Sequence, residues 1–128
     1  MPSPTPPARI GLIVLATVII AALVSISLWP THVDQALDID PRFHRLVESC
    51  ANVAFYLPLG ILARICLPRV SGAVVIALGC LTSGCFELLQ AVLPIDRTPA
   101  IIDVATNTVG VAIGWWVAGA VERDRRGD

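Results

Sequence analysis

The stretch Ser83-Gly-Cys-Phe-Glu-Leu-Leu-Gln-Ala-Val-Leu-Pro-Ile-Asp-Arg-Thr-Pro-Ala-Ile-Ile-Asp-Val-Ala-Thr-Asn-Thr-Val-Gly110 joins two long apolar segments through a short polar turn. Polar side chains also occur inside the apolar segments, at Glu87 and Gln90 before the turn and at Asp103 and Asn107 after it. An ionisable side chain within a membrane segment costs about 2.5–3.5 kcal/mol on insertion scales. We therefore expect these four side chains to have a function and the rest of the chain to hold them in place.

The composition of the chain is that of a membrane protein. Of its 128 residues, 55% are apolar and 15% are charged, whereas a soluble domain has roughly 45–50% and about 25%. The length fits at most one domain. A net charge of −1 gives no bulk basicity, so nucleic acid is not an expected partner and the lipid bilayer is.

The apolar residues fall into four segments, each about as long as a membrane-spanning helix. The sequence therefore predicts an all-α fold, an integral membrane bundle of four transmembrane helices within residues 10–121. Residues 1–9 are rich in proline and predict a disordered tail, and residues 122–128 form a charged tail. A signal peptide competes for the first segment, but signal peptides have shorter apolar regions, about 7–15 residues. The predicted spans are about 10–28, 49–67, 70–93 and 100–121.

Local signals mark the ends and contact faces of these spans. Asp40 and Pro41 are typical of a helix start, with Asp as the cap and Pro at the first position. Pro58 should bend the second span. Small residues four apart allow close helix contact, and these pairs are Ala73 with Ala77, Gly79 with Ser83, Cys80 with Gly84, and Gly110 with Gly114.

The cysteines do not suggest a site of their own. They lie in apolar segments, form no CxxC motif and lack ligand-spaced His or Cys partners, so we expect small apolar side chains rather than disulfides or a metal site. No cofactor is indicated. The four are Cys50, Cys66, Cys80 and Cys85.

Arginines predict the orientation, because positive charge accumulates on the cytoplasmic side. In the four-span arrangement, six of the nine basic residues share one side with both termini, which are therefore predicted to be cytoplasmic. The 31–48 loop and the 94–99 turn then lie outside. The cytoplasmic set is Arg9, Arg64, Arg69, Arg123, Arg125 and Arg126, and the outer set is Arg42, Arg45 and Arg97.

Counting from the predicted helix ends places the polar side chains in the outer half of the membrane. Gln90 should be level with Asp103, Glu87 level with Asn107, and Asn52 at a similar depth. Two interpretations stay open. The groups either hydrogen-bond helix to helix, at about 0.6 kcal/mol per bond, or they line a water-accessible pocket that binds a polar ligand.

The second span also begins with a polar stripe. His44, Glu48, Asn52 and Tyr56 recur every four residues, which places them on one helix face. The stripe is either simply solvated at its start and packed further on, or it contributes His44 to a site. The sequence does not decide between these roles.

Several of these residues form an ordered series: Asn52 to Gly60 with its Pro-Leu-Gly end, Glu87-x-x-Gln90, Arg97, and Asp103-x-x-x-Asn107-x-x-Gly110. This series resembles the VanZ-like family of small bacterial membrane proteins. The family takes its name from a protein linked to low-level teicoplanin resistance. The resemblance implies the bacterial cytoplasmic membrane and a role at the cell envelope, but it supplies no mechanism.

We therefore predict an outward-facing polar pocket that binds an envelope lipid, a cell-wall precursor or a glycopeptide, with teicoplanin resistance as one implied role. One alternative is a membrane enzyme acting on a lipid-linked envelope precursor, with Glu87 as base and Asp103 as the other candidate catalytic residue. Another is a structural or interaction protein whose polar groups only hold helices together. The predicted ligand-binding residues are Asn52, Glu87, Gln90, Arg97, Asp103 and Asn107.

Overall fold

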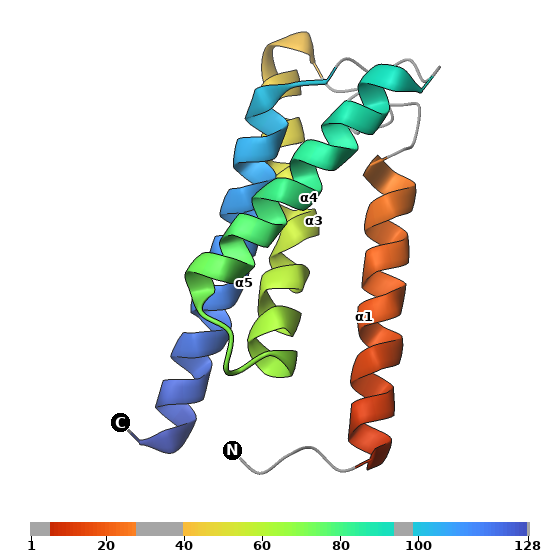
Figure 1. Cartoon of the computed structure of the whole chain (residues 1–128). Helices are drawn as coiled ribbons and strands as arrows, with labels where there is room; N and C mark the ends of the chain where they lie inside the picture. Colours follow the sequence, from red (N-terminus) through yellow and green to blue (C-terminus); the bar gives the residue numbers. More distant parts are fainter. Residues whose placement is uncertain (1–5, 28–39, 94–98, 128) are drawn as a thin grey trace.

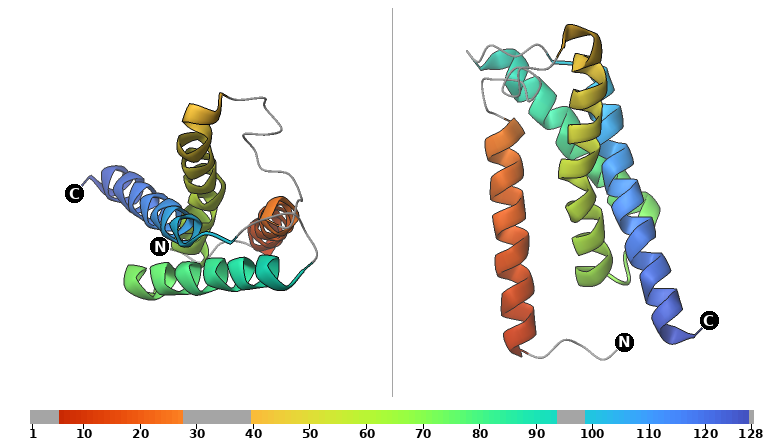
Figure 2. Two further views of the ribbon diagram at one scale, coloured as in Figure 1. Left: turned by 90° about the horizontal axis from the view of Figure 1, so that it is seen from above. Right: turned by 180° about the vertical axis from the view of Figure 1, so that it is seen from behind.

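The computed structural model describes residues 6–27, 40–93 and 99–127, and within them the chain is helical and contains no β-strand. The helices run up and down beside one another, with α4 inclined to the others (Figures 1 and 2). The predicted all-α fold is confirmed. The elements are α1 (Pro6–Ser27), the short 3-10 helix η1 (Pro41–Phe43), α3 (His44–Cys66), α4 (Gly72–Val92) and α5 (Ile101–Arg126).

The predicted helix start at Asp40 and Pro41 is confirmed. The Asp40 carboxylate accepts a hydrogen bond from the Arg42 backbone N–H at 3.0 Å, and Pro41 occupies the first helical turn. The Arg42 guanidinium also binds this carboxylate at 2.8 Å, and these hydrogen bonds lower the pKa of Asp40. From this cap η1 leads directly into α3, which runs through Pro58 to Cys66 as one helix.

Helix α1 begins at Pro6 and therefore includes residues 6–9 of the expected N-terminal tail. Pro6 and Pro7 are tolerated there because the N–H groups of a first helical turn have no partner within the helix. At the other terminus α5 continues to Arg126, through most of the expected charged tail, and Gly127 ends it in the left-handed conformation with φ 74°.

The closest helix contact is the crossing of α3 and α5, and glycines make it possible. A side chain at Gly60 of α3 would collide with the backbone carbonyl of Val111, and one at Gly114 of α5 would collide with the carbonyl of Leu57. At Gly110 an added Cβ would lie 2.5 Å from the carbonyl oxygen of Val53. The close approach predicted for the 110 and 114 pair is thus confirmed, with backbone packed against backbone.

Helix α4 completes the core from the other side of α5. Of its three small-residue pairs only Gly79 and Ser83 face α5, since a Cβ at Gly79 would lie 2.9 Å from the Val111 side chain and Ser83 is fully buried. Ile19 of α1 packs against the edge of this core. The core cluster consists of Tyr56, Val75, Val111 and Trp115.

The outer surface of the bundle is apolar. Ile101 is 90% exposed and Val92 is 79% exposed, and many other large aliphatic side chains point outward. Such a surface suits lipid rather than water. Three helical segments of the described chain are long and apolar enough to cross a membrane, namely Pro41–Cys66, Gly72–Val92 and Ile101–Arg125.

Candidate functional site

The buried polar side chains gather on two helices, α4 and α5. Asp103 and Asn107 lie in the first two turns of α5, while Ser83 and Gln90 lie on the second half of α4. Burial of such groups is unfavourable unless they find hydrogen-bond partners. Within the described chain these four are the buried polar residues, so the end of the bundle where α5 begins is its polar end.

Asn107 and Ser83 form the innermost polar contact. The Asn107 side-chain amide donates to the Ser83 hydroxyl at 2.8 Å, and both side chains are buried. The Asn107 carbonyl oxygen is also buried, yet no described group donates a hydrogen bond to it. Leaving a buried acceptor unsatisfied costs roughly 1–3 kcal/mol. This oxygen is therefore available to a donor on a ligand or a water molecule.

Ser83 was expected only as a small contact residue, and its polar role was missed. It lies four residues before Glu87, which places the two on one face of α4. That spacing was the available signal, because a serine on the same face as a carboxylate within an apolar helix is a polar group in need of a partner.

The side chain of Glu87, a residue of α4, lies beside the start of α5. Its carboxylate accepts a hydrogen bond from the backbone N–H of Ala100 at 2.7 Å. Ala100 is the cap residue of α5 and its own side chain cannot cap the helix. Glu87 therefore caps α5 from a neighbouring helix. In a capping box, by comparison, the acidic residue that accepts the cap N–H belongs to the capped helix itself.

This contact corrects the predicted depths. Glu87 is level with Ala100 instead of Asn107, and Asn107 is level with Ser83 instead of Glu87. The facing residue is thus about two turns away from the expected one for Glu87 and about one turn away for Asn107. The prediction counted depth from assumed helix ends on parallel axes, whereas α4 is inclined to α5 (Figure 1).

Asp103 and Gln90 lie within one turn of this cap. The Asp103 backbone N–H donates to the Ala100 carbonyl at 3.0 Å, so Asp103 and Glu87 both bind the Ala100 residue. A carboxylate in the first turn of a helix also interacts favourably with the helix dipole. Gln90 follows Glu87 by three residues on α4 and is 4% exposed, so it shares that face and is buried.

Helix α3 contributes Asn52 to the polar end. Its side-chain amide donates to the Thr106 hydroxyl of α5 at 3.4 Å, a long hydrogen bond. Along the stripe that includes Asn52, His44 is half-buried and Tyr56 is 3% exposed, so the stripe becomes a packing surface. Arg97, the remaining predicted site residue, lies outside the described residues.

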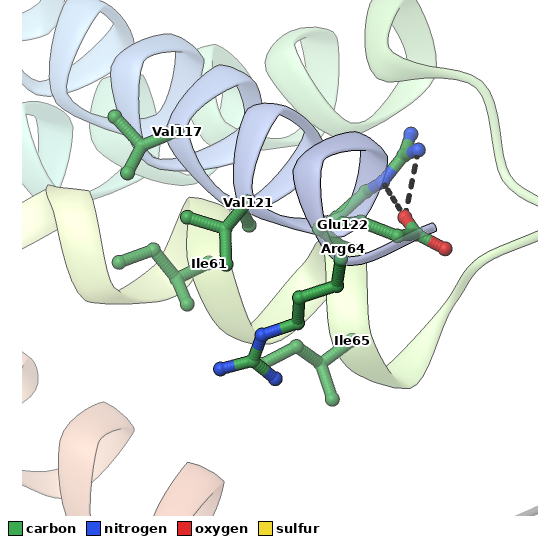
Figure 3. Close-up of a pocket in the computed structure, with 8 residues that line it drawn as sticks. Ile61, Arg64, Ile65, Val117, Val121 and Glu122 are labelled. Carbon is green, nitrogen blue, oxygen red and sulfur yellow. Dashed lines mark hydrogen bonds and ion pairs between the residues drawn. The ribbon is translucent and has the colours of Figure 1, made fainter. Parts of the chain in front are cut away.

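The opposite end of α3 and α5 holds a charge pair. The Arg64 guanidinium binds the Glu122 carboxylate at 2.9 and 3.0 Å and lies 4.9 Å from the centre of the Trp115 ring. Figure 3 shows this pair beside an apolar cavity. Glu122 is thus part of the packed bundle and not only of a charged tail.

The described chain is helical, with an apolar exterior, three membrane-compatible helices and a polar interior at one end. These features are those of a multi-pass membrane protein. The VanZ/LLP1 family model matches residues 10–122, so the chain belongs to the VanZ/LLP1 family. The resemblance drawn from the sequence is confirmed. Comparison with curated proteins and with solved structures found no match.

Proposed function

We propose that the polar end of the bundle binds the polar part of a cell-envelope component on the outer side of the bacterial cytoplasmic membrane. The observation that carries the proposal is the buried carbonyl oxygen of Asn107, which has no donor among the described residues. A ligand that donates a hydrogen bond there would remove the cost of burying it. The proposed site consists of Asn52, Ser83, Glu87, Gln90, Asp103 and Asn107, together with Arg97 on sequence grounds alone.

The arrangement of the helix ends supports this orientation. The first turn of α1, the connection between α3 and α4, and the last turns of α5 lie at one end of the molecule (Figure 1). That end carries most of the arginines, among them Arg64, Arg69 and Arg123, and arginines accumulate in the cytoplasm. The polar end then faces outward. We include α1 in the proposal as a fourth span, since its 22 residues are long enough to cross a bilayer.

The chemistry of the site favours a ligand with hydroxyl or amine donors. Two carboxylates and an amide oxygen are acceptors, and they come from Glu87, Asp103 and Asn107. Envelope lipids, cell-wall precursors and glycopeptides all carry such donors. Low-level protection against teicoplanin is the specific phenotype that we propose to test.

A second candidate function is structural, and two contacts favour it. Glu87 binds the Ala100 backbone and Asn107 binds Ser83, and each of these hydrogen bonds joins α4 to α5. On this alternative the polar groups only fix how the helices meet. The hydrogen bond from the Ala100 N–H to Glu87 is a structural contact that an enzymatic role does not require.

Drug susceptibility of bacteria that express the protein tests the proposal. The variants are Glu87→Gln and Asp103→Asn, which keep size and remove charge, and the matched control is Asp124→Asn at an exposed position of α5. With membrane levels equalised by blot, wild type and control should protect against teicoplanin or another envelope-active agent, and the two site variants should not. Equal protection by all four proteins, or none by any, would contradict the proposal.

A further inference from the structure

A cavity of about 870 Å³ lies between the ends of α3 and α5, far from the proposed site. This volume is within the roughly 300–1,000 Å³ typical of ligand pockets. Aliphatic side chains form most of its wall, and charged side chains stand beside them (Figure 3). The wall consists of Ile61, Ile65, Val117, Ala118 and Val121, and the charged residues are Arg64, Glu122 and Arg125.

The charged groups leave the cavity with a net positive charge. Two nitrogen atoms of Arg64 bind one oxygen of Glu122, so these two charges balance each other. Arg125 also lines the cavity. The ion pairs among the described residues join Arg42 with Asp40 and Arg64 with Glu122, and Arg125 is in neither. One guanidinium therefore remains for a negatively charged ligand.

The position of the cavity fits a lipid better than a water-soluble ligand. Its apolar wall opens onto the exterior of the bundle, where Ile65 is 52% exposed and Val117 is 46% exposed. The basic groups stand where α3 ends and the last turns of α5 begin, at the boundary of the apolar spans. Basic pockets between helices at that level bind anionic lipid head groups.

We propose that this cavity binds an anionic phospholipid such as phosphatidylglycerol. An acyl chain lies along Ile61, Val117 and Val121, and the phosphate lies beside Arg125. A zwitterionic lipid carries its own cation and so gains less from the unbalanced guanidinium. This inference is independent of the proposed envelope-binding function, because the two sites share no residue.

Native mass spectrometry of the full chain tests the proposal, in nonionic micelles that contain equal amounts of dioleoyl phosphatidylglycerol and dioleoyl phosphatidylcholine. Wild type should retain more phosphatidylglycerol. Arg125→Gln should lower the retained ratio about fivefold, the contribution of one basic residue near an anionic lipid. Ala118→Leu, which extends a side chain into the cavity, should reduce retention of both lipids.

Two controls separate this site from general charge attraction. Arg123→Gln removes an exposed arginine of the same helix that does not line the cavity, and it should leave the ratio unchanged. Excess glycerol 3-phosphate, the head group without chains, should not displace the lipid. Equal retention of both lipids by wild type, an equal drop for Arg123→Gln, or displacement by glycerol 3-phosphate would each overturn the proposal.

Discussion

The middle of α5 and its N-terminal end are held to their neighbours in different ways. At the middle, Gly114 packs directly on the Leu57 carbonyl, and shape alone fixes this contact. Toward the N-terminal end, Asn107 and Ala100 donate hydrogen bonds to side chains of α4. The glycine crossing shows that this chain can join helices without buried polar groups. The polar groups at the N-terminal end of α5 therefore call for a reason beyond packing.

Breaking the glycine crossing should have the largest effect on stability. Gly114→Leu places a side chain where the Leu57 carbonyl lies, and since backbone cannot move aside locally, α3 and α5 must separate. We expect a loss of about 3 kcal/mol or more in the free energy of unfolding, measured in detergent. Gly84→Ala is the control, because nothing lies within 4 Å of its added Cβ, and it should be neutral or stabilising. Equal losses of unfolding free energy in the Gly114 and Gly84 variants would contradict the close packing of α3 on α5 at Gly114.

The charge pair near the C-terminal end of α5 should matter next. Arg64→Gln removes one charged contact of the Glu122 carboxylate, whose side chain is 13% exposed. We expect a loss of about 2 kcal/mol, less than for a fully buried pair. Adding Glu122→Gln to this variant should recover part of the loss. If the double variant unfolds as easily as the single one, packing of the long arginine side chain rather than charge is what matters.

At the polar end, the cap on α5 should have a smaller effect. Glu87→Ala removes the acceptor for the Ala100 N–H and should cost about 1 kcal/mol in thermal unfolding. Glu87→Gln keeps an acceptor oxygen in place and should retain most of the stability. An equal loss in the two variants would show that the charge, and not the hydrogen bond, stabilises the start of α5.

The smallest expected effect is at the start of α3. Hydrogen bonds from Arg42 lower the pKa of Asp40 from its ordinary value of 3.8. The charged cap therefore stabilises the helix fully at pH values above 3.8, and this stabilisation is lost as the pH falls through the lowered pKa. An NMR titration of the Arg42 amide should follow this change, and Asp40→Asn should abolish it. A titration at the ordinary value would contradict the cap.

The sequence predicted the helical class, the cap at Asp40 and the close contact at Gly114, because each depends on residues near one another in the chain. It did not predict that Glu87 meets Ala100 or that Arg64 meets Glu122. Both contacts depend on the inclination of one helix against another, which spacing along a single helix does not specify.

The polar residues of the candidate site could be named from the sequence, since they interrupt apolar segments. Their partners could not, and for that reason Ser83 was read as a small contact residue instead of a hydrogen-bond acceptor for Asn107. The cavity beside Arg125 could not be predicted from the sequence, because its wall has the same aliphatic residue types as the rest of the bundle surface.

The most direct test of a ligand site at the polar end is the double variant Ser83→Ala with Asn107→Leu. Replacing both partners of a buried hydrogen bond by apolar groups of similar shape is nearly neutral for stability. We predict an unfolding free energy within about 1 kcal/mol of wild type and loss of the protection against envelope-active agents that wild type confers. Full protection by a variant that accumulates to wild-type levels would contradict the account and leave the polar groups as helix contacts.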